Sequence, residues 1–168
     1  MAKNTKNNDE QQSTEVKVSA DENNCDVDKT LSVLSDLYKN VTMAQNAVKT
    51  LLPYVEDGEM TKSLHSQVET YDKYIEQIGT LAETLNFEPT PAPNFALGMA
   101  GMGIRMKMMT DRSTSHIAKI MLQGTLNGII ELYRLAKLSD VVHPEVALFT
   151  RRLLKYEEGR FEEMKSRL

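Results

Sequence analysis

The sequence lacks the Glu-x-x-His motif, because none of its three histidines follows a glutamate by three residues. A di-iron carboxylate centre in a helical bundle takes two such pairs, together with a glutamate from each of two further helices. This chain can supply neither pair. We therefore expect no iron, manganese or zinc site, no other cofactor and no enzymatic activity.

Other absences narrow the class further. Cys25 is the single cysteine, which excludes a disulfide framework and a thiolate metal cluster. No apolar run reaches the length of a signal peptide or the roughly 20 residues that span a bilayer, so we expect a cytoplasmic protein without membrane contact. The 20 basic and 24 acidic residues form no basic cluster, so no nucleic-acid partner is expected.

The first 29 residues contain no aromatic side chain and only scattered apolar ones. Such a segment cannot bury enough surface to offset the entropy lost on ordering. Seven acidic and four basic residues in this segment account for most of the net negative charge. The sequence therefore predicts a disordered acidic tail over residues 1–29 and a folded body over residues 30–168.

Two long helices are expected at the start of the body, over residues 30–56 and 58–86. Their apolar residues recur at alternating intervals of three and four, which is typical of amphipathic helices. Asp28 is the expected N-cap of the first helix, and Pro53 should kink or tighten its last turn. The linker between the helices is so short that they must pack as an antiparallel hairpin.

Three prolines interrupt the helical pattern after residue 86. Pro89, Pro91 and Pro93 stand at alternate positions and favour an extended segment. A short helix over residues 95–110 should follow, and Ser113 or Asp111 is well placed to cap the next long helix.

The last two helices, over residues 113–138 and 144–167, again flank a short loop and should form a second hairpin. Two hairpins joined by a long connection indicate an all-α fold with ferritin-like topology. We expect a four-helix bundle of two antiparallel hairpins, with a long crossover that contains the short methionine-rich helix.

Three stretches also support a resemblance: DRSTSHIAKIMLQGTLNGIIEL, the preceding MGIRMKMM, and the later LLKYEEGRFEEMKSRL. Together they resemble an uncharacterised family of ferritin-like four-helix-bundle proteins from Firmicutes. The resemblance covers residues 31–168 and is most specific over residues 103–128. It implies a ferritin-like bundle without an assigned activity, and it implies that Gln123 and Glu157 match positions of the family pattern.

Four residues are weak candidates for a divergent metal site. His65 and Glu69 share a helix face at a spacing of four, His116 begins the third long helix, and Glu157 lies within an apolar stripe. If these side chains point inward, they could bind a metal and support redox chemistry. This is the alternative to a protein without a metal.

Gln123, Asn127 and Glu157 are candidates for a buried polar network, because each falls on or near an expected inner face. Buried polar groups are tolerated when they are hydrogen-bonded. The simplest interpretation is a structural network inside the bundle.

Four methionines of the crossover helix form a stripe, since they recur at intervals of three and four. They are Met99, Met102, Met106 and Met109. The simplest interpretation is that this stripe packs the helix onto the bundle. A subunit interface is the second interpretation, because methionine surfaces are adaptable, and binding of copper or lipid is the third.

These observations favour a non-enzymatic structural or protein-interaction module, and we expect it to form a homo-oligomer. The alternative is the divergent metal-binding or redox protein described above. The sequence identifies no protein partner.

Overall fold

The computed structural model describes residues 25–90 and 92–168, and the regular structure in these ranges is entirely helical. This confirms the all-α class. The predicted tail over residues 1–29 lies outside the described residues, apart from its last five positions. The elements are α1 (Val27–Leu51), a 3₁₀-helix η2 (Leu52–Tyr54), α2 (Gly58–Thr84), α3 (Asn94–Met108), α4 (Thr114–Ala136) and α5 (Pro144–Lys165).

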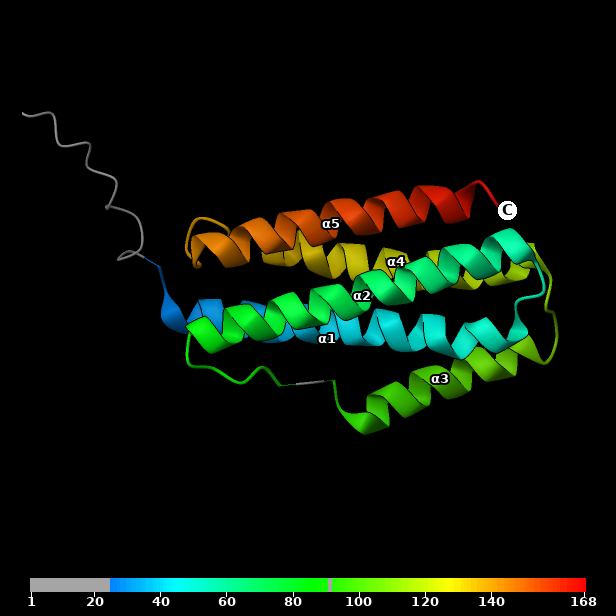
Figure 1. Ribbon diagram of the computed structural model, residues 1–168, viewed down its shortest axis with the longest axis horizontal. Coiled ribbons are helices and arrows are strands. Elements are labelled where there is room, and N and C mark those ends of the chain that lie inside the picture. The colour runs from blue at the N-terminus through cyan, green and yellow to red at the C-terminus, as the bar shows by residue number, and fades with distance from the viewer. Residues whose placement is uncertain (1–24, 91) are drawn as a thin grey trace, which may run out of the picture.

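The long helices α1, α2, α4 and α5 lie side by side (Figure 1). The chain turns back between α1 and α2 and again between α4 and α5, so each of these pairs is antiparallel. The connection from α2 returns along the molecule and includes α3, which packs against α1. As a result, α2 and α4 run in the same direction (Figure 1).

Helix α1 begins earlier than the sequence predicted, at Val27, and its N-cap is Asp26 instead of Asp28. The Asp26 carboxylate accepts a hydrogen bond from the Lys29 amide at 3.0 Å, and the Asp26 amide donates to the Val141 carbonyl at 2.7 Å. The second contact ties the start of α1 to the turn between α4 and α5. Helix α1 therefore takes in the last three positions of the predicted tail, and this long-range contact holds residues that have little apolar surface of their own.

Two helix ends show how local chemistry sets the boundaries. Pro53 lies in η2, so the last turn before the hairpin is tightened as predicted. At the other end of α2, Asn86 adopts a φ of 51°, and the Phe87 amide donates to the Ala82 carbonyl at 2.9 Å. This is a Schellman ending, for which asparagine is the usual substitute for glycine.

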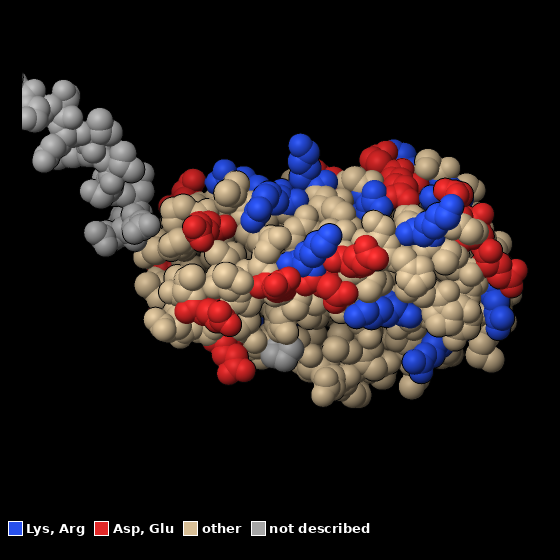
Figure 2. All heavy atoms as spheres, viewed as in Figure 1, with Lys and Arg blue, Asp and Glu red and all other residues tan. Residues whose placement is uncertain are grey.

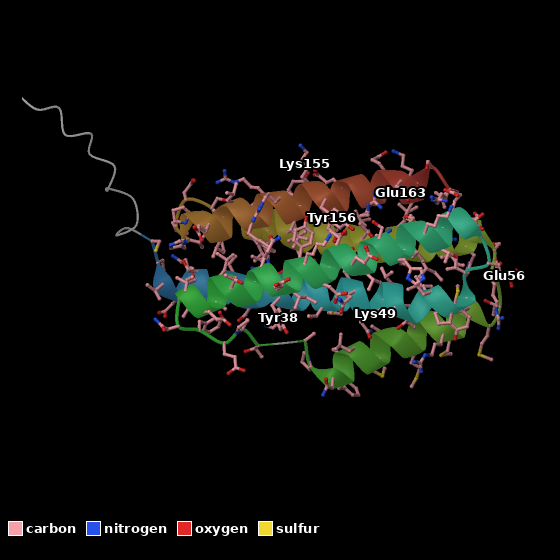
Figure 3. The ribbon with its side chains drawn as sticks, viewed as in Figure 1. Tyr38, Lys49, Glu56, Lys155, Tyr156 and Glu163 are labelled. Atoms are coloured by element: carbon pink, nitrogen blue, oxygen red, sulfur yellow. The ribbon has the colours of Figure 1, made fainter. Side chains whose placement is uncertain are left out.

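Aromatic side chains fill the space between α2 and α5. Tyr71 meets Tyr156 edge to face with ring centroids 5.8 Å apart, and Tyr74 meets both Phe149 at 5.6 Å and Tyr156 at 5.5 Å. Figure 3 shows Tyr156 on α5 facing α2. Such edge-to-face pairs add to the stabilisation from burial, and the bulk of the rings sets the spacing of the two helices.

Helix α3 presents its methionine stripe outward, so the interpretation that this stripe packs on the other helices is wrong. Met99, Met102, Met106 and Met109 are 53%, 56%, 65% and 81% exposed. A second apolar row faces α1 instead, and Met108 on that row is fully buried. A helix that is apolar on both faces gives no sequence signal for which one packs inward.

The α3 surface is largely uncharged. Figure 2 shows basic side chains beside it and a wide tan area between them. The segment Asn94–Met108 contains two basic residues, Arg105 and Lys107, and no acidic residue. A contiguous exposed apolar face of this kind is typical of interaction sites.

The aromatic packing between α2 and α5 predicts a large difference between neighbouring residues. Phe149→Ala should lower the free energy of unfolding by about 3–5 kcal/mol, because it removes a fully buried ring and leaves a cavity. Leu148→Ala is the matched control, since Leu148 is 54% exposed, and it should change this free energy by less than about 0.5 kcal/mol. Urea unfolding followed by circular dichroism measures both, and equal losses would contradict the packing described.

Candidate functional site

A groove of ≈ 560 Å³ lies among α1, α3 and α4, and it is the candidate site. Small residues line its wall: Ala44, Ala47, Ala100, Gly124 and Gly128. Small side chains leave space that larger ones would fill, so the sequence itself produces the hollow. Larger apolar side chains complete the lining: Met43, Val48, Leu51, Ile104, Ile120 and Met121.

Polar contacts hold the two walls of the groove against α1. The Asn40 side-chain amide donates to the Gly128 carbonyl on α4 at 3.2 Å. The Asn46 side-chain amide donates to the Leu97 carbonyl on α3 at 3.3 Å. At Gly128 a Cβ would lie 3.5 Å from the Asn40 side chain, which is an ordinary van der Waals contact. These contacts fix the width of the groove.

The charges at the mouth of the groove largely cancel. Asp36 pairs with Arg134 at 3.1 Å and with Lys39 at 3.4 Å. Glu131 also hydrogen-bonds Arg134, which lowers the pKa of the Glu131 carboxyl. Lys107 donates to Gln123 across the mouth at 3.3 Å. The mouth therefore exerts little net attraction on either sign of charge.

Glu157 lies at the buried end of this groove and is only 2% exposed. Tyr71 lines the same end and hydrogen-bonds the Glu157 carboxyl. The other carboxyl oxygen, Oε1, has no hydrogen-bond partner among the described residues. A buried polar atom without a partner carries a desolvation penalty, so this oxygen has unused capacity to accept a hydrogen bond.

Burial raises the pKa of the Glu157 carboxyl from 4.5 to about 7, because the charged form loses its hydration. The hydrogen bond from Tyr71 and the charge of Arg160 oppose this rise without cancelling it. The same burial raises the pKa of Tyr156 to about 12 and holds that of Tyr71 well above its ordinary value. Glu157 is thus the group of this cluster that titrates near neutral pH.

The nearest cation is engaged elsewhere. Arg160 forms an ion pair with Glu163, and its guanidinium lies over the Tyr156 ring at 5.6 Å from the centroid. Figure 3 shows Glu163 on the same helix, beyond Tyr156 toward the C-terminus. Within the described ranges Glu157 itself takes part in no ion pair. Its charge is therefore uncompensated by direct contact.

Two of the predicted buried polar residues are in fact exposed. Gln123 and Asn127 lie at the rim of the groove, where Gln123 contacts Lys107. The prediction failed because α3 stands apart from α4 at this level and leaves their strip uncovered. Glu157, the third member, is buried as expected, but it shares no network with the other two.

The weak metal candidates do not come together. His65 and Glu69 are exposed on α2, because the inward face of that helix carries Leu64 and Tyr71. His116 lies at the start of α4, with its Nδ1 3.7 Å from the Asp111 carboxylate. In residues 25–90 and 92–168 no three His, Cys, Asp or Glu side chains are arranged to hold a metal ion.

Gln67 is a core polar residue that the sequence analysis missed. Its side chain is fully buried, and neither its oxygen nor its nitrogen has a partner among the described residues. The signal was present in the spacing, since Gln67 stands between Leu64 and Tyr71 at intervals of three and four. It lies one turn from Tyr71 on the buried face of α2.

A second hollow of ≈ 400 Å³ lies at the turn between α4 and α5. Its polar lining includes Asp140 and Arg151, which are both exposed. No polar lining residue there is desolvated in the way that Glu157 is, so the groove remains the stronger candidate.

Comparisons with known proteins give no match: no family model, no curated protein and no solved structure is similar to this chain. Among the described residues, no helix is both long and apolar enough to cross a membrane.

The raised pKa of Glu157 predicts a stability that depends on pH. The folded state holds the Glu157 proton more tightly than the unfolded state, so the contribution of this group to stability is fully present below pH 4.5 and is lost as the pH rises through about 7. The shift corresponds to about 3 kcal/mol. Glu157→Gln cannot ionise and should remove this fall.

The measurement is urea unfolding of both proteins between pH 5 and pH 8. The carboxyls of Asp26, Asp111 and Glu131 have lowered pKa values, so they titrate below this range and do not affect the comparison. The difference in free energy of unfolding between the two proteins should change by about 3 kcal/mol over the range. A constant difference would show that Glu157 ionises normally.

Proposed function

We propose that this chain is a non-enzymatic ferritin-like domain that binds an apolar small molecule in the groove among α1, α3 and α4. The observation that carries the proposal is the buried end of the groove, which Glu157 lines and where its buried Oε1 has no hydrogen-bond partner among the described residues. A ligand that supplies a hydrogen-bond donor would relieve this penalty.

The size and lining of the groove support a small ligand. Its volume of ≈ 560 Å³ falls within the roughly 300–1,000 Å³ of small-molecule sites, which are mostly apolar with a few placed polar groups. A slender chain needs less width than a helix from another protein, whose diameter with side chains is about 10–12 Å. The groove therefore suits a slender molecule better than a protein segment.

The ferritin-like assignment rests on connectivity. Two antiparallel hairpins with a long connection, and with α2 parallel to α4, match the bundle type that has one long crossover. The resemblance of residues 31–168 to ferritin-like proteins points the same way.

A binding role is preferred to an enzymatic one because of what lines the groove. Its described lining contains no serine, cysteine or histidine, the side chains most often used as nucleophile or general base. A metal or redox role would require His65, Glu69, His116 and Glu157 to converge, and among the described residues no three His, Cys, Asp or Glu side chains are grouped to hold a metal ion.

Filling the groove should abolish binding. Gly124 lines it, and a Cβ at this position would meet no atom within 4 Å, so Gly124→Phe can fold while its ring occupies the hollow. With n-octanol as probe, this variant should bind at least about tenfold more weakly than the wild type. Amide chemical-shift titration measures the affinity and locates the site.

The control is Gly159→Phe, an exposed helical glycine on α5 with equally open surroundings. Its affinity for n-octanol should equal that of the wild type. The proposal fails if the wild type shows no shifts along α1, α3 and α4, or if both variants bind equally.

The exposed methionine stripe favours a second role, self-association. Gly98 and Gly103 flank the stripe, and a Cβ at either would meet nothing within 4 Å, so another helix could approach closely. We propose that a second copy of this chain packs its α3 antiparallel against the first. Burial of flexible methionines would then supply the driving force.

Charge placed on this stripe should separate the copies without unfolding the chain. Met102→Glu combined with Met106→Glu should convert the homo-oligomer to a monomer in light scattering after gel filtration, because each carboxylate would be buried unpaired at the interface. The melting temperature extrapolated to low concentration should change little. Leu148→Glu, exposed on α5, is the control and should leave the oligomer intact; a monomeric wild type would refute self-association.

A further inference from the structure

We propose that the ligand of the groove is an apolar amine, and that its protonated nitrogen pairs with Oε1 of Glu157 at the buried end. This inference rests on the proposed groove-binding function, and it assigns the chemical class of the ligand.

The hydrogen-bonding inventory at the buried end favours a donor. Tyr71 is the polar residue that lines this end with Glu157, and its hydroxyl already donates to the carboxyl. The vacant position is on Oε1, which accepts when the group is ionised. A carboxylate or phosphate ligand would bring only acceptors to this point, whereas an ammonium group brings several donors.

The charge balance favours a cation over a neutral donor. Arg160 is held by Glu163 and by the Tyr156 ring, so it does not neutralise Glu157. An ammonium ion would form a charge-assisted hydrogen bond, which is roughly twice as strong as a neutral one. It would also let Glu157 ionise in the core without leaving an unpaired buried charge.

The rest of the groove suits the remainder of such a molecule. An alkyl or aryl body would contact the apolar wall formed by Val48, Ile104 and Met121. The mouth would repel a cation only weakly, because Asp36 and Glu131 offset most of the charge of Lys39, Lys107 and Arg134. Entry would therefore depend on shape and apolar surface.

Binding should be coupled to loss of a proton from Glu157. Below about pH 7 the carboxyl is protonated, and an ammonium ligand must displace that proton to form the pair. The affinity should therefore rise by up to about tenfold per pH unit toward pH 7 and then level off.

The charged or titratable groups that face this end or line the groove are Asp36 and Lys39 of α1, Tyr71 and Tyr74 of α2, Lys107 of α3, Glu131 of α4, and Tyr156 and Arg160 of α5. None of their cited pKa shifts places a titration between pH 5 and pH 8.

The test compares three probes with one chain length and different head groups: n-octylamine, n-octanol and octanoate. Calorimetric titration of the full chain at pH 7.5 should give at least about tenfold tighter binding of n-octylamine than of n-octanol. Octanoate should bind most weakly. Repeating the n-octylamine titration at pH 5.5 should weaken it by more than about tenfold, while n-octanol changes little.

The outcomes separate the two proposals. If neither n-octanol nor n-octylamine binds, the groove-binding function itself fails. If n-octanol binds as tightly as n-octylamine, or octanoate binds best, the groove function stands and the amine assignment is overturned. Each of these results comes from the wild type, so none depends on the folding of a variant.

A variant then assigns the effect to Glu157. Glu157→Gln should bring n-octylamine to the affinity of n-octanol and remove its dependence on pH, while n-octanol binding persists. Glu158→Gln is the control, because that neighbouring carboxylate hydrogen-bonds Tyr133 on the exposed side, and it should keep the preference for the amine. A preference that survives Glu157→Gln would place the amine elsewhere.

Discussion

The candidate site depends on the burial of the Glu157 carboxyl. A carboxyl that is almost fully buried is tolerated only if it is neutral or well solvated by protein groups. Tyr71 provides one hydrogen bond, and the aromatic rings between α2 and α5 pack beside the carboxyl and help to bury it. Glu157 is therefore left with a pKa near neutral and with one carboxyl oxygen, Oε1, that has no hydrogen-bond partner among the described residues. The residue that has both properties lines the groove.

The groove that Glu157 lines exists because of α3. Without α3, the side of α1 beneath the groove would be open surface. Because α3 packs on α1 through Met108 and is tied at Asn46, it stands apart from α4 and forms the second wall. The small residues facing this space, such as Ala47 and Gly124, leave it unfilled. The same helix carries its methionine stripe outward, so α3 bears both the groove wall on one side and the exposed methionines on the other.

Much of the fold could be predicted from the sequence, because local chemistry sets it. The three-and-four spacing, together with the prolines and the expected caps, located all five helices. Pro53 predicted the tightened turn, and the position of Glu157 in an apolar stripe predicted its burial. The predictions that failed concerned features that tertiary contacts determine. The cap at Asp26 needs Val141 from a distant turn, and the exposure of Gln123 needs a gap between two helices that no local pattern encodes.

The central claim is that Glu157 is a buried acid with a free acceptor at the end of the groove. The most direct measurement is the carbon-13 shift of its side-chain carboxyl against pH in the ligand-free chain, with the resonance assigned by its loss in Glu157→Gln. The account predicts a midpoint of about 7. A midpoint near the ordinary 4.5 would mean that the carboxyl is solvated or paired in solution, and it would contradict the site described here.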